Sequence, residues 1–187
     1  MKNIIISIFC LSLFGQTIIY SKEIKQSMKT LVIYYSLTGH TKAVAVELAL
    51  KLNADLRKIE NMATLKIGPW LFITGGFASV FNKQWKIKPV DLNLANYDRI
   101  FIGSPVWAGK SVPTVNTFLA NTDFTGKSVI PFVTMGGPNG KSAIKNLSKK
   151  ISEKGGKIVS SFSVRAGKKP EDTLIKAKEI IEQYVNK

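Results

Sequence analysis

The chain has 187 residues, of which 45% are hydrophobic and 10% aromatic. This length suits a single domain with a well-filled core, and the composition excludes an extensively disordered chain. The formal net charge is +15 at pH 7, which favours anionic lipid, acidic proteins or polyanions as partners, although a merely solvated lysine-rich face has the same composition. No recognised nucleic-acid motif accompanies the charge, so we expect no nucleic-acid partner.

The first 21 residues differ in character from the rest. Lys2 precedes an uncharged apolar run over residues 4–20, which is typical of an export signal. The alternatives are an uncleaved membrane anchor, for which the run is slightly shorter than the roughly 20 residues that span a bilayer, and a buried strand. An export signal or a membrane anchor would each predict a periplasmic or otherwise extracytoplasmic protein. The only cysteine, Cys10, lies here, so the remainder can form no disulfide.

Short apolar runs then alternate with helical patterns over residues 29–187. Strands are predicted at 30–36, 54–59, 99–104, 128–135 and 157–164, and helices at 41–52, 112–121, 142–154 and 171–185. This alternation favours an α/β fold, a three-layer doubly wound sandwich around a five-stranded parallel sheet. Ligands of such sheets bind beyond the carboxyl ends of the strands.

Residues 61–94 are too many for one compact crossover. One approximate helical face consists of Trp70, Ile73, Phe77, Val80 and Phe81. The favoured interpretation is a crossover helix that packs this face on the sheet, although each glycine of Gly75-Gly76 weakens a helix by about 1 kcal/mol. Flanking lysines leave a lid, a dimer contact or a membrane-surface patch as alternatives.

A turn rich in hydroxyl groups follows the first of these strands. It consists of Ser36, Leu37, Thr38, Gly39, His40 and Thr41. A helix start has unpaired N–H groups and a partial positive charge, so an anion such as a terminal phosphate binds well there. A helix capped by Thr38 alone is the simpler alternative. His40 is either an exposed helix-start residue or a pH-dependent contact to the phosphate.

Two further turns follow strands and are expected at the same edge. One contains Pro105, Val106, Trp107, Ala108 and Gly109, and the other contains Thr134, Met135, Gly136 and Gly137. An indole at this edge can stack on a flat heterocycle, and glycines let the backbone reach a ligand. The three turns therefore predict a slot for a phosphate and a planar ring. Neither a P-loop nor a dinucleotide-binding glycine motif is present.

Together these turns resemble those of the flavodoxin family, in its short-chain form, over residues 29–187. The resemblance implies strand order 2-1-3-4-5 and one noncovalently bound FMN. By position, the turn at 36–41 holds the phosphate, residues 105–109 flank the isoalloxazine with Trp107 against it, and residues 134–137 line its pyrimidine side. No catalytic residue and no metal site is predicted.

Flavodoxins that carry electrons are typically acidic and dock on basic partners, whereas this chain is basic. We therefore expect electron transfer with an acidic or membrane-associated partner, or with a small-molecule acceptor. The alternatives are an NAD(P)H-dependent reductase of quinones or other small acceptors, and a non-redox module that binds anionic surfaces. The electron donor and the oligomeric state stay open.

Overall fold

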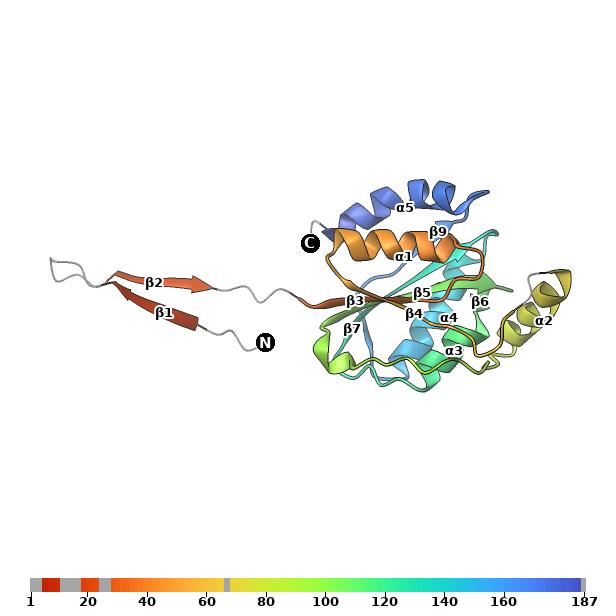
Figure 1. Cartoon of the computed structure of the whole chain (residues 1–187), viewed down its shortest axis with the longest axis horizontal. Helices are drawn as coiled ribbons and strands as arrows, with labels where there is room; N and C mark the ends of the chain where they lie inside the picture. The colour runs from red at the N-terminus through yellow and green to blue at the C-terminus, as the bar shows by residue number, and fades with distance from the viewer. Residues whose placement is uncertain (1–4, 11–17, 24–27, 66–67, 186–187) are drawn as a thin grey trace.

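A parallel sheet runs through the middle of the molecule (Figure 1). The computed structural model describes residues 5–10, 18–23, 28–65 and 68–185. In sheet order the parallel strands are β4 (Asp55–Lys58), β3 (Thr30–Tyr34), β5 (Arg99–Trp107), β7 (Ser128–Met135), and at the edge β8 (Lys157–Ile158) and β9 (Phe162–Arg165). β8 and β9 pair with successive parts of β7, so the predicted last strand is interrupted. The predicted order 2-1-3-4-5 is confirmed.

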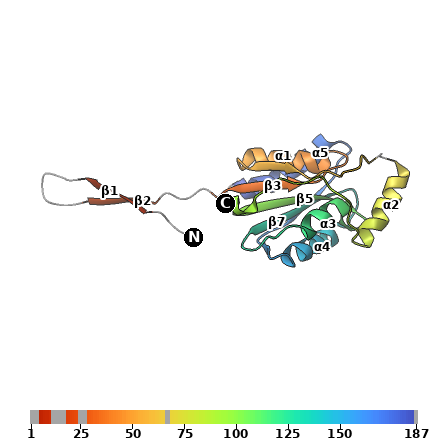
Figure 2. The same ribbon diagram turned by 60° about the horizontal axis from the view of Figure 1, so that its bottom comes forward.

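Helices cover both faces of this sheet, which confirms the three-layer prediction. α1 (His40–Lys51) and α5 (Pro170–Val185) lie on one face, and α3 (Pro113–Ala120) and α4 (Gly140–Ser152) on the other (Figures 1 and 2). Side chains of a strand alternate between faces, so Leu31 and Ile33 of β3 join the α3/α4 core whereas Val32 and Tyr34 join the α1/α5 core. Each such buried side chain contributes about 1.5–3 kcal/mol to stability.

The segment between β4 and β5 holds helix α2 (Pro69–Val80) and the short 3-10 helix η1 (Leu94–Asn96). α2 contacts β5, β6 (Lys110–Ser111) and α3. The favoured prediction, that the large apolar face of this helix packs on the sheet, is wrong. Those side chains are exposed: Trp70 by 75%, Ile73 by 63%, Phe77 by 63%, Val80 by 43% and Phe81 by 57%. The reason is that the helix packs inward through small residues that are buried.

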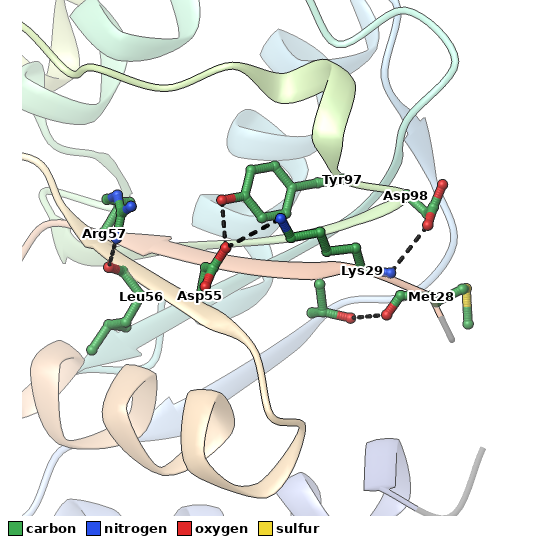
Figure 3. Close-up of polar contacts among 8 residues, drawn as sticks. Met28, Lys29, Asp55, Leu56, Arg57, Tyr97 and Asp98 are labelled. Atoms are coloured by element: carbon green, nitrogen blue, oxygen red, sulfur yellow. Dashed lines mark hydrogen bonds and ion pairs between the residues drawn. The ribbon is translucent and has the colours of Figure 1, made fainter. Parts of the chain in front are cut away.

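The amino ends of the strands are closed by polar contacts (Figure 3). The backbone N–H of Lys29 donates to the carboxylate of Asp98 (3.1 Å), and Tyr97 Oη donates to Asp55 Oδ2 (2.6 Å). The ammonium group of Lys29 lies 4.0 Å from the same oxygen of Asp55. The hydrogen bond to Asp55 raises the pKa of Tyr97. This edge is therefore already paired, which leaves the opposite, carboxyl edge for a ligand.

The N-terminal segment is described as two strands. β1 (Ile5–Cys10) pairs antiparallel with β2 (Ile18–Glu23). Residues 1–4 and 11–17 of the predicted export signal or anchor lie outside the described residues. Within the part of the chain that the structure describes, no helix has the length and apolar character needed to cross a membrane. Export or anchoring by residues 1–21 stays a prediction.

Candidate functional site

The three turns singled out in the sequence meet at one edge of the sheet. β3, β5 and β7 are parallel neighbours, with Tyr34 opposite Gly103 and Pro105 opposite Thr134. Their carboxyl ends therefore point the same way, toward the end of the molecule where α2 lies (Figures 1 and 2). The predicted common edge is confirmed.

The first turn leaves the start of α1 uncapped. Gly39 occupies the N-cap position with φ 92°, no side chain caps the helix, and its first turn contains no acidic residue. The interpretation that Thr38 caps the helix is therefore wrong. Thr38 is exposed, and the hydroxyl oxygen of Ser36 accepts a hydrogen bond from the Gly39 N–H (3.1 Å). The helix start thus combines free N–H groups with nearby hydroxyls, which suits an anion.

Gly39 is required in this turn for two reasons. Its positive φ disfavours other residues, and a Cβ atom there would lie 3.0 Å from Cγ of Pro170, the first residue of α5. The close approach of α5 also explains the position of His40. Its Nδ1 lies 2.7 Å from Oγ1 of Thr173, which is buried. His40 is thus half-buried and bonded to α5, an arrangement that neither interpretation of the sequence anticipated.

Thr41 joins the first turn to the third. Its side chain is buried, and its Oγ1 lies 2.7 Å from Oγ1 of Thr134, which is also buried. Either hydroxyl can be the donor. Because the pair shares only one of its two protons, the other proton stays available for a further acceptor. The contact holds the start of α1 against the carboxyl end of β7.

The second turn is a tight hairpin, and the strand before it is longer than the predicted 99–104. β5 continues to Trp107 and pairs antiparallel with β6, with Trp107 opposite Lys110. Ala108 and Gly109 connect the strands with φ of 47° and 76°, and two consecutive positive φ angles match the twist of a two-residue hairpin. Pro105 and Val106 are half-buried within β5. The hairpin gives Trp107 a defined position at the sheet edge.

Helix α2 rests directly on the Trp107 indole. A Cβ atom at Gly75 would lie 2.5 Å from Cζ3 of Trp107, so only glycine allows this approach. Trp85 contacts the same indole edge-on, with ring centroids 5.8 Å apart at 65°. Trp107 is therefore half-buried between α2 and Trp85. Gly75 and Trp85 are neighbours of the site that the sequence did not indicate as site residues.

The third turn keeps space around its glycines. A Cβ atom at Gly136 or Gly137 would meet nothing within 4 Å, whereas one at Gly140 would collide with the Met135 sulfur. Protein packing thus explains Gly140 but neither Gly136 nor Gly137. Both exposed glycines leave backbone N–H and C=O groups accessible at this edge. Of the other predicted residues, Met135 and Leu37 are half-buried and pack against the α3/α4 core.

A polar network lies behind the hairpin. The ammonium group of Lys150 donates to Asn116 Oδ1 (2.5 Å) and to Ser111 Oγ (3.2 Å). Burial, and secondarily the charge of Lys110, lowers the pKa of Lys150 to about 8. Lys150, Asn116, Asn82 and Gln84 are among the residues that line a nearby cavity of about 400 Å³. The cavity includes none of the three turns, and it is separate from the candidate site.

An open parallel α/β sandwich with three converging turns at its carboxyl edge defines a flavodoxin-like protein. The sequence model of the flavodoxin family matches residues 79–174, just over half of the chain. The chain therefore belongs to the flavodoxin family. An uncharacterised protein of Methanocaldococcus jannaschii is 29% identical over 137 residues, which cover 72% of this chain and 73% of that protein.

Solved structures share this fold. A flavoprotein from Lactobacillus acidophilus, crystallised in complex with FMN, is 23% identical with a TM-score of 0.66, covering 86% of this chain and 99% of that one. A putative flavoprotein from Bacteroides uniformis is 24% identical with a TM-score of 0.67, covering 87% and 100%. Oxidised flavodoxin 2 from Bacillus cereus is 19% identical with a TM-score of 0.56, covering 84% and 98%. At these identities the likeness concerns the fold.

Proposed function

We propose that this chain binds one FMN at the three turns and transfers electrons with an acidic or membrane-associated partner. The observation that carries the proposal is the meeting of the uncapped start of α1 with the carboxyl ends of β5 and β7, through the Thr41–Thr134 contact and the pairing of Pro105 with Thr134. Family membership and a flavoprotein neighbour crystallised with FMN support the choice of ligand.

The residues present fit the phosphate end of FMN. A phosphate carries about two negative charges and several acceptor oxygens, so it needs donors and no nearby carboxylate. The first turn of α1 offers uncapped N–H groups and no acidic residue. The exposed hydroxyl of Thr38 and the second proton of the Thr41–Thr134 pair are further potential donors. Such a group requires no lysine for binding.

The residues at the other two turns fit the ring. Trp107 offers an aromatic side chain for stacking, held in place by the hairpin turn and by α2. Gly136 and Gly137 have free space around their α-carbons, so backbone groups can donate to and accept from the polar edge of a heterocycle. When bound, FMN would supply one- and two-electron transfer, and the protein would position it and limit its contact with water.

The charge of the chain bears on its partner. The net charge of +15 makes a basic docking partner unfavourable, because like charges repel at an interface. Residues 141–169 contain nine Lys or Arg and a single acidic residue, Glu153. Four of the nine basic residues lie on α4 and the other five follow it. We therefore propose an acidic protein or an anionic surface as the site of electron exchange. An exported location is part of the same proposal, and the pattern of residues 1–21 is its only support.

The optical spectrum of the purified full-length chain tests FMN binding. We expect a yellow protein with the absorbance of a bound flavin, or a colourless one that becomes yellow after incubation with FMN and gel filtration. Denaturation should release about one FMN molecule per protein chain. A chain that stays colourless after incubation with FMN would favour a non-redox module that binds anionic surfaces through its lysines.

A further inference from the structure

Helix α2 turns its small residues toward the domain and its large apolar residues away from it. Its small residues face the domain: Gly75, Ala78 and Ser79 are buried, and Gly75 touches Trp107. Its large residues face away, with Trp70, Ile73 and Phe77 each more than half exposed. A helix on the surface of a water-soluble protein normally has the opposite arrangement. The large apolar side chains on the outward side of α2 are therefore not packed against other apolar groups of the domain.

The exposed large side chains recur at helical spacing, three, four and seven residues apart. We call them the α2 patch: Trp70, Ile73, Phe77, Val80 and Phe81. Phe77 and Phe81 contact each other, with ring centroids 4.4 Å apart. The hydroxyl of Thr74 is bonded within the helix to the carbonyl of Trp70 (2.8 Å), so it presents no free donor beside the patch. Exposed apolar patches rimmed by polar residues mark interaction sites.

The charged residues of the segment that holds α2 have one sign. Residues 61–90 contain no Asp or Glu. Lys83 and Lys86 are exposed just beyond the end of α2. Lys110 donates to the carbonyl of Val80 (2.8 Å), which places a third ammonium group at the same helix end. An apolar helix face with lysines beside it is the pattern of helices that lie in the interface of a membrane, and lysines there are attracted to anionic lipids.

We propose that the α2 patch docks on the surface of an anionic lipid bilayer, with its apolar side chains in the headgroup region and Lys83 and Lys86 on the lipid phosphates. A second copy of the chain is a poorer occupant. It carries the same lysines and no acidic residue within 61–90, so contact through this face offers no charge complement.

This inference deepens the proposed function, because it names the partner surface and rests on that function for its role in electron transfer. α2 touches Trp107 through Gly75, so docking would bring the proposed ring site next to the membrane. A lipid-soluble electron acceptor or a membrane-bound protein would then be within reach. Docking itself requires only the α2 patch and its lysines.

Tryptophan fluorescence of the full-length chain with vesicles tests the docking. The vesicles contain phosphatidylcholine with or without phosphatidylglycerol, and their acyl chains carry bromine, which quenches only tryptophans that enter the bilayer. Residues 1–27 contain no tryptophan, so an insertion of the N-terminal segment alone produces no signal. We expect quenching on anionic vesicles at low salt that weakens at high salt. Trp70→Phe should abolish most of it, and Trp85→Phe should not.

Two matched double variants test whether vesicle binding depends on the α2 patch or on any exposed apolar side chain. Phe77→Ser with Phe81→Ser should lower vesicle affinity about tenfold or more, since burying one aromatic side chain is worth more than the 1.4 kcal/mol of a tenfold change. Leu50→Ser with Ile175→Ser removes two apolar side chains elsewhere that are at least as exposed, and it should leave the affinity unchanged.

Three results would overturn the docking. One is absence of Trp70 quenching on anionic vesicles, and another is equal quenching on neutral vesicles at any salt concentration. The third is a dimer in sedimentation velocity that the Phe77 and Phe81 substitutions dissociate while vesicles have no effect, which would make a second copy the occupant. A protein that binds FMN but is not quenched by anionic vesicles refutes docking alone. A protein that docks but stays colourless after incubation with FMN refutes FMN binding alone.

Discussion

The side-chain oxygens of Thr41 and Thr134 lie 2.7 Å apart, across the space between the start of α1 and the carboxyl end of β7. Both side chains are buried, so the contact is shielded from water. It links the turn proposed to hold a phosphate with the turn proposed to line a ring. The spacing of the two turns is thereby set by the protein before any ligand arrives, which lowers the cost of ordering them on binding.

Replacing Thr41 with valine should loosen this link. The substitution keeps the shape of the side chain but leaves Thr134 without its partner, which costs roughly 1–3 kcal/mol for a buried polar group. We expect a lower free energy of unfolding in chemical denaturation and weaker FMN binding. Thr41→Val combined with Thr134→Val should recover part of the stability, because no unpaired hydroxyl remains. A double variant that is no more stable than either single one would contradict a direct pairing.

The two adjacent glycines of α2 provide a matched test of its packing on Trp107. Alanine favours a helix over glycine by about 1 kcal/mol, so Gly76→Ala should stabilise the protein, since its nearest neighbour would be Ala108 Cβ at 3.9 Å. Gly75→Ala should instead destabilise it, because the new Cβ would collide with the indole. Thermal unfolding of the two variants measures the difference. Equal shifts in the same direction would mean that α2 does not rest on Trp107.

Trp107 should determine both the affinity for FMN and the fluorescence of the bound flavin ring. We expect Trp107→Ala to weaken FMN binding and to restore the fluorescence of the bound flavin, because stacking on an indole quenches it and contributes to affinity. Trp70→Ala, which removes an exposed indole of α2, is the control and should leave both unchanged. The measurement is a fluorescence titration of FMN with each variant. Unaltered quenching in the Trp107 variant would rule out its stacking role.

The half-buried ammonium group of Lys150 predicts a pH dependence of stability. Its pKa is lowered from 10.5 to about 8, mainly by burial. Between about pH 8 and 10.5 the unfolded chain binds this proton whereas the folded chain does not, so stability should rise with pH in that window. Lys150→Met should flatten the rise, measured by urea denaturation at several pH values. Lys149→Met, which removes an exposed ammonium group, should retain it.

The sheet and its strand order could be predicted because buried parallel strands appear in the sequence as continuous apolar runs. Runs such as that of β3, buried at every position, alternate with helical patterns, and short connections restrict how they can be joined. The common edge of the three turns follows from strand direction alone. By contrast, the contact between His40 and Thr173 joins residues 133 positions apart, and no local pattern indicates such a pair.

The orientation of α2 could not be read from hydrophobicity. Trp70, Ile73 and Phe77 share a helical face, and an apolar face usually points inward. The opposite face, with Gly75 and Ser79 four residues apart, was the signal for close packing, but small residues carry little weight in a hydrophobic pattern. The hairpin at Trp107 was missed for a related reason, because Ala108 takes a positive φ that alanine rarely adopts.

The comparison of FMN with riboflavin tests the central claim most directly, because the two ligands share the ring and differ by the phosphate. Titration of the full-length chain, freed of bound ligand, should show one FMN per chain and riboflavin binding at least about tenfold more weakly, as expected if the phosphate gains more than 1.4 kcal/mol at the start of α1. Replacing Thr38 with valine should narrow that gap. Equal affinity for both ligands, or binding of neither, would contradict a phosphate site in the turn at 36–41.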